Sequence, residues 1–177
     1  MNCSHLSLAI LLFLLELCLQ IDGSIKFSSL ECQVFTPDVG DIKECRIGST
    51  KKDINIIFDC KKTISAFQIK FKLLKRENGT WRPFLYAMTI DICDFFQNPK
   101  KYMIPNMLYS YIKKSSNINH TCPYEAGTEL ALTKWNLDES NILSKMSVNS
   151  GEYAMHSSWY SSEQMVLQIN GSVKYTA

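Results

Sequence analysis

The chain has 177 residues, of which 46% are hydrophobic and 20% are charged, and its formal net charge is +2. This length suits one domain with a substantial core. Its lysines and arginines form isolated doublets rather than a cluster, which argues against nucleic acid as a partner.

Residues 1–23 are predicted to be an export signal, leaving a single secreted domain at 24–177. The run from Leu6 to Leu15 is almost purely apolar, but it is too short to span a bilayer. An uncleaved anchor is the less favoured alternative. No later stretch is apolar enough to cross a membrane, so we expect a soluble, extracellular protein, and a monomer.

Three early segments alternate between apolar and polar residues and are predicted strands: Ile25–Cys32, Ile42–Ile47 and Ile54–Phe58. A turn near residues 37–40 joins the first two. Cys32 and Cys45 therefore lie on neighbouring predicted strands, and we predict a disulfide between them.

The region from Phe67 to Ile90 is predicted to be one β-hairpin that turns at Asn78-Gly79, a pair suited to a type I′ turn. That turn pairs Glu77 with Thr80 and fixes the register. Four apolar pairs should then share one face: Leu73–Phe84, Phe71–Tyr86, Ile69–Met88 and Phe67–Ile90. Pro83 lacks an amide donor, so its strand should be edge-like there. This face would be the inner wall of a β-sandwich or of an open cup.

The pattern then changes to a helical period, with Pro105 in the first turn of a helix that should begin near Ile104 and end by Ser115. The apolar stripe consists of Ile104, Met107, Leu108, Tyr111 and Ile112. We predict a second disulfide, Cys93–Cys122, which would attach this helix to the sheet and contribute about 3–4 kcal/mol.

Cys60 is left without a partner by these two pairs. It continues the face of Ile54, Ile56 and Phe58, so a buried, inert thiol is the favoured interpretation. An intermolecular disulfide is the alternative.

Two late strands complete the chain. Tyr153, Met155 and Trp159 alternate with smaller residues, and a second alternating run extends from Met165 to Tyr175. Between the helix and these strands the sequence is polar and turn-rich, with short strand material at Leu130–Trp135. About seven strands with one amphipathic helix predict a mainly β protein, an Ig-like antiparallel β-sandwich.

No catalytic constellation is present, so we do not expect an enzyme, and the sequence suggests neither a cofactor nor a metal. His120 and His156 are the candidate bases, but a loop contact and a surface position are their simpler interpretations. Asp91 more often accepts backbone N–H groups at such a position than acts as an acid. Three sequons predict glycosylation, at Asn78, Asn119 and Asn170.

Three segments resemble a known family: Arg82–Tyr86, Thr89–Cys93 and Asn117–Tyr124. The chain is similar there to small secreted insect proteins, chiefly of flies, that carry a domain of unknown function. That family is in turn distantly similar to the ML superfamily of lipid-recognition proteins. The resemblance covers nearly all of the mature chain and implies an ML-like two-sheet cup that takes a lipid between its sheets. Some relatives are associated with chemosensory organs and contact-pheromone detection.

The leading functional hypothesis is a secreted carrier for a lipid or another hydrophobic small molecule. Its cavity would be lined by Phe67, Ile69, Phe71, Leu73, Phe84, Tyr86, Met88, Ile90, Met107, Leu108, Tyr111, Met155, Trp159, Leu167 and Ile169. The alternative is a closed core in a protein-interaction module, such as a receptor accessory. Its only hints are Leu74 and Ile57, which are apolar on otherwise polar faces.

Overall fold

The computed structural model describes residues 24–85, 87–137 and 148–176. The predicted export signal and Tyr86 lie outside the described residues. The strands are β1 (Ser24–Val34), β2 (Gly40–Ile47), β3 (Asp53–Cys60), β4 (Phe67–Glu77), β5 (Thr80–Pro83), β6 (Met88–Asp91), β7 (Glu129–Asn136), β8 (Gly151–Ser161) and β9 (Gln164–Thr176). The helices are α2 (Ile92–Gln97), the 3₁₀ turn η1 (Pro99–Lys101) and α3 (Met103–Ile112).

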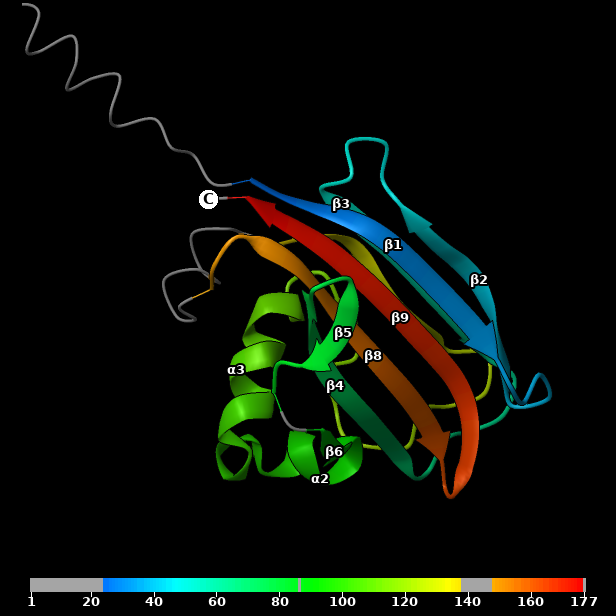
Figure 1. Ribbon diagram of the computed structural model, residues 1–177. Coiled ribbons are helices and arrows are strands. Elements are labelled where there is room, and N and C mark those ends of the chain that lie inside the picture. Colours follow the sequence, from blue (N-terminus) through cyan, green and yellow to red (C-terminus); the bar gives the residue numbers. More distant parts are fainter. Residues whose placement is uncertain (1–23, 86, 138–147, 177) are drawn as a thin grey trace, which may run out of the picture.

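The strands form two antiparallel sheets, which confirms the predicted mainly β sandwich (Figure 1). The larger sheet has the order β1-β9-β8-β4-β5, with β6 also paired to β4, and the smaller has the order β2-β3-β7. The core between them combines Phe27, Phe71 and Ile169 of the larger sheet with Phe58 and Leu130 of the smaller. The helices lie together beside β4, β5 and β6 (Figure 1).

One helix was not predicted, because α2 follows β6 without a break. Its N-cap is Asp91, whose carboxylate accepts a hydrogen bond from the Asp94 amide at 3.0 Å. The expected backbone-capping role of Asp91 is thus confirmed. The segment Ile92–Gln97 is as apolar as the strand before it, so pattern alone gave no sign of a change in backbone conformation.

The predicted hairpin register holds near the turn and fails beyond Pro83. Asn78 and Gly79 both have positive φ, 50° and 78°, and Glu77 pairs with Thr80 as expected. Further along, however, Phe71 pairs with Met88 and Ile69 pairs with Ile90. The predicted pairs Phe71–Tyr86, Ile69–Met88 and Phe67–Ile90 are therefore wrong.

The shift arises where the second strand of the hairpin is interrupted. After Pro83, which has no amide hydrogen, the amides of Phe84 and Leu85 both donate to the Leu73 carbonyl, at 2.8 and 3.3 Å. The chain rejoins β4 only at Met88, two residues later than a regular ladder would. Because an even shift preserves the alternation, the apolar side chains keep their common face.

Both predicted disulfides are present, Cys32–Cys45 and Cys93–Cys122. The sequence placed Cys32 and Cys45 on neighbouring strands. In the structure these two strands belong to different sheets, and the bond connects β1 of the larger sheet to β2 of the smaller. It therefore ties the two layers together along one side. The second ties α2 to the segment before β7.

Replacing Cys32 and Cys45 together by Ala should lower the free energy of unfolding by about 3 kcal/mol, because the bridge closes a short loop in the unfolded chain. The sequence separation is 13 residues. Urea unfolding of the oxidised variant and the wild type measures the difference. An unchanged unfolding midpoint would show that the bridge does not hold the sheets together.

Cys60 should not react with Ellman's reagent in the folded protein. Its side chain is 0% exposed, and burial raises the pKa of its thiol to about 11, so neither access nor thiolate is available. In urea, the unfolded chain from Ser24 onward should expose the thiol of Cys60, and one equivalent of thiol should then react with Ellman's reagent. Rapid reaction in the folded state would contradict the burial of Cys60.

Candidate ligand-binding site

The pairing of four strands decides which side chains face the interior of the sandwich. One row across the larger sheet contains Phe71, Ser157, Ile169 and Cys32, on β4, β8, β9 and β1. This row faces inward, because Cys32 is bonded to the opposite sheet and Phe71 and Ile169 belong to the core. The row two residues further along contains Leu73, Met155, Gly171 and Leu30. It faces the same way, since alternate residues of a strand share a face.

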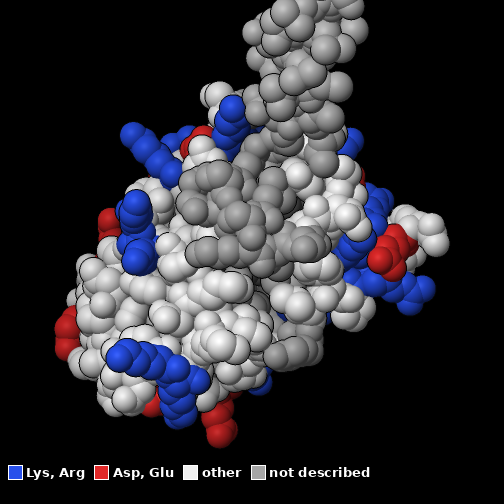
Figure 2. Space-filling model, turned by 90° about the vertical axis from the view of Figure 1, so that its left-hand side faces the viewer, with Lys and Arg blue, Asp and Glu red and all other residues white. Residues whose placement is uncertain are grey.

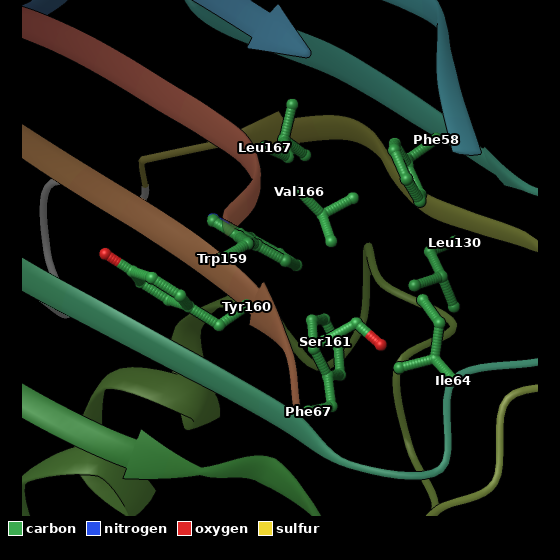
Figure 3. A pocket seen from close by; sticks show the side chains of 9 residues that line it. All are labelled: Phe58, Ile64, Phe67, Leu130, Trp159, Tyr160, Ser161, Val166 and Leu167. Atoms are coloured by element: carbon green, nitrogen blue, oxygen red, sulfur yellow. The ribbon is translucent and has the colours of Figure 1, made fainter. Parts of the chain in front are cut away.

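One end of the sandwich is tightly packed. Side chains from both sheets converge there on a void of about 10 Å³ (Figure 3). The void is lined by Phe58, Ile64, Phe67, Leu130, Trp159, Tyr160, Ser161, Val166 and Leu167. Such a volume is at the lower limit for a single water molecule. The predicted cavity residues Phe67, Trp159 and Leu167 are therefore packed as core at this end.

The row of Leu30, Gly171, Met155 and Leu73 is different, and we refer to it as the open row. Met155 points inward from β8, a central strand flanked by β9 and β4, yet its side chain is 39% exposed. Gly171 beside it contributes no side chain, and a Cβ built there would find its nearest atom, Leu30 Cδ1, at 3.7 Å. Solvent therefore reaches the inward face of the larger sheet at this row.

Two aromatic rings border the open row. The Phe84 and Tyr153 rings meet edge to face with centroids 5.3 Å apart. Tyr153 lies two residues from Met155 on the same face, and the Phe84 amide is bonded to the Leu73 carbonyl at 2.8 Å. Burial raises the pKa of Tyr153, whose hydroxyl donates to the Asn149 carbonyl at 2.8 Å. This neutral hydroxyl makes the border amphipathic.

The helix α3 rests on the edge of the sandwich without completing its core. Leu108 packs against core residues, whereas none of the ten residues of α3 is fully buried. The indole of Trp135 on β7 donates to the Tyr111 carbonyl at 3.1 Å and so fixes the end of the helix. The helix has no charged residue, and Figure 2 shows a broad uncharged area on this side with Lys and Arg around it.

The predicted cavity residues fall into three groups. Five are buried in the core: Phe67, Phe71, Ile90, Leu167 and Ile169. Four are partly buried and pack against it: Ile69, Met88, Leu108 and Trp159. Five lie outside that cluster and are partly or mainly exposed: Leu73, Phe84, Met107, Tyr111 and Met155. Tyr86 is outside the described residues.

Sequence reasoning missed Gly171 and Leu30. Gly171 interrupts an alternating apolar run on β9, a pattern that signals missing side-chain volume within a strand. The hint of an interaction surface at Leu74 is wrong, because that side chain is only 7% exposed. It lies beside Ala154 and Pro83 in the neighbouring strands, and Ala154 is buried as well.

A second depression, of about 540 Å³, lies on the outward side of the larger sheet. It is lined by Ala66, Gln68, Lys70, Tyr160, Ser162 and Glu163. The Lys70 ammonium lies 4.6 Å from the centre of the Tyr160 ring. Its charged and polar lining does not suit an apolar ligand.

His120 and His156, the two candidate bases, both contact neighbouring groups of the fold. The His120 ring stacks on Tyr124 with centroids 4.5 Å apart, and its Nδ1 lies 2.6 Å from the Thr121 carbonyl oxygen. His156 points outward, beside Lys72 and Asn170 in the neighbouring strands. Within the described part of the chain, no group of three His, Cys, Asp or Glu side chains is placed to hold a metal ion. No described helix is long and apolar enough to cross a membrane.

The three sequons occupy different environments. Asn78 is exposed at the tip of the β4–β5 turn, and Asn119 is exposed in a loop. Asn170 is partly buried on the outward face of β9, and its buried Oδ1 has no hydrogen-bond partner among the described residues. The first two positions offer a glycan free access to water, whereas the third requires it to stand on the outward face of the larger sheet.

Acidification should destabilise the fold partly through His156. Burial, and secondarily Lys72, lower the pKa of His156 below its usual value of 6.5, although Glu31 opposes the shift. The unfolded chain therefore binds the proton more readily, and the free energy of unfolding falls as the pH drops below that value. Urea unfolding between about pH 7.5 and about pH 5.5 should show a smaller loss for His156→Gln than for the wild type. Equal losses would contradict this role.

Comparison with known proteins places one segment in a family. No curated protein matches the chain. A family model described as a protein of unknown function, DUF1091, matches residues 69–155. The match runs from β4 to the middle of β8, and it includes Leu73, Phe84 and Met155 but neither Leu30 nor Gly171. Residues 69–155 thus contain a DUF1091 domain.

Proposed function

We propose that the protein is a secreted binding protein for a lipid or another hydrophobic small molecule, and that the ligand covers the open row. The observation that carries the proposal is the exposure of Met155. Met155 is an apolar side chain on the inward face of a central strand, and at 39% exposure it forms an apolar surface that the described part of the chain leaves partly uncovered. A hydrophobic ligand would complete the core at this point.

The chemistry of the open row suits such a ligand. Leu30, Leu73 and Met155 offer flexible aliphatic contacts, and methionine adapts to irregular apolar shapes. Gly171 leaves room beside them. Each methylene removed from water contributes roughly 0.8 kcal/mol, so the gain from burial grows with the length of the hydrocarbon chain.

The cellular setting supports the same proposal. Two disulfides are typical of an oxidising compartment such as the extracellular space. The resemblance to secreted insect proteins, and through them to ML lipid-recognition proteins, agrees with a lipid between two sheets. A part in chemosensory perception, such as pheromone detection, would follow from that resemblance.

A protein-interaction module is the second candidate. It is favoured by the packed end, where the enclosed void is only about 10 Å³, and by the uncharged surface of α3. Met103 on this helix is 80% exposed, and a receptor could cover it. This candidate requires no ligand at the open row.

Met155→Glu should abolish binding of a fluorescent hydrophobic probe such as N-phenyl-1-naphthylamine, because a carboxylate would replace the apolar centre of the site. Its matched control is Ser158→Glu, which places the same group on the outward face of the same strand. We expect at least about a tenfold weaker Kd for the first variant, about 1.4 kcal/mol, and an unchanged Kd for the control.

Gly171→Leu offers a second test that adds no charge. Its backbone does not have positive φ, and the nearest atoms are at ordinary contact distance, so the side chain should be tolerated and should occupy the ligand's space. Native mass spectrometry of the secreted wild type should detect a bound lipid that this variant lacks. A wild type that carries no lipid and binds no probe would favour the interaction module.

A further inference from the structure

Two basic side chains lie at the rim of the open row. Lys75 follows Leu73 by two residues on β4 and therefore points to the same inward side. It pairs with Tyr153 on β8 and, on its other side, with Arg82 on β5. Lys75 and Arg82 thus lie directly opposite one another, beside the aromatic border of the site.

Like charges that face one another across an antiparallel pair are destabilising. The nearest compensation is Glu77, whose Oε1 is 3.9 Å from the Lys75 ammonium, a long contact by a mainly exposed carboxylate. Within the described residues Arg82 makes no ion pair. Among the described residues, the rim therefore holds two cations and one weakly engaged anion, so one positive charge has no counterpart there.

On the outward face of the same hairpin, a basic side chain has an acidic partner. Arg76, the next residue along β4, donates to Glu152 at 2.7 Å and lies over the Trp81 ring at 5.8 Å. Glu152 therefore compensates the charge of Arg76, although Lys174 and Lys26 continue the same outward row. Arg76 thus has an anionic partner at hydrogen-bond distance, which Lys75 and Arg82 lack among the described residues.

We propose that the ligand of the open row is an anionic amphiphile with a carboxylate head group, held by Lys75 and Arg82 while its chain lies on Met155 and Leu73. This inference rests on the proposed function and specifies its ligand class. Arg presents a planar fork of donors that matches a carboxylate, and Lys adds a point charge from the other side. Rows two residues apart are about 7 Å from each other, so the head group at the rim leaves the first methylenes over the open row.

The test compares ligands that share one hydrocarbon chain and differ in the head group: oleate, oleyl alcohol and methyl oleate, with acetate as the head group alone. Displacement of the fluorescent probe gives each Kd near neutral pH. We expect oleate to bind wild-type protein about tenfold more tightly than oleyl alcohol, because a charge-assisted hydrogen bond is lost with the alcohol. Raising the salt concentration should weaken oleate alone.

The double variant Lys75→Met, Arg82→Gln should lose the preference for oleate and keep its affinity for oleyl alcohol. Retained alcohol binding shows that the variant is folded. The matched control is Lys72→Met, which removes a charge from the outward face of β4 and should leave the preference intact.

Each other outcome has a distinct meaning. Equal Kd values for oleate and oleyl alcohol in the wild type would overturn the carboxylate inference and leave the proposed function standing. Binding of acetate as tight as oleate would overturn it in favour of a site for small anions. Failure of every long-chain ligand and of the probe would overturn the proposed function itself.

Discussion

Antiparallel pairing across β4, β8, β9 and β1 is the constraint on which the rest of the structure depends. It places Phe71, Ser157, Ile169 and Cys32 in one row, and every other row of the sheet takes its orientation from that one. Cys32 then bonds to Cys45 on the smaller sheet, so the same row also connects the two layers. A slip of one residue in any of these pairings would turn apolar side chains outward and break this connection.

Along this scaffold the packing of the interior differs between the start of β4 and the open row. Near the start of β4, large side chains such as Phe67 and Leu167 meet residues of the smaller sheet and leave almost no space. Further along the strands, Ser157 and then Gly171 supply little volume on the inward face, and Met155 remains accessible. The difference follows from side-chain size at equivalent positions of one regular sheet. A protein that required only stability would be expected to fill that space.

The interruption of the hairpin at Pro83 determines which side chains lie at the rim of the open row. Because Pro83 ends the ladder between β4 and β5, Phe84 leaves the strand and its ring packs against Tyr153. The short β5 nevertheless persists long enough to hold Arg82 opposite Lys75. A single residue without an amide hydrogen thus separates the basic part of the rim from its aromatic part.

The sequence alone determined the features that depend on neighbours along the chain or on a simple repeat. Alternation located the strands, Asn78-Gly79 set the first hairpin pairs, and the positions of the cysteines predicted both disulfides. Tertiary structure decided what depends on contacts between distant segments. The two-residue shift after Pro83, the helix at Ile92–Gln97 and the separation into a packed end and an open row arise from such contacts. Alternation shows only which face of the sheet Met155 lies on. Whether the opposite layer covers that side chain depends on the volumes of residues far away in sequence, and the one-dimensional pattern does not contain that information.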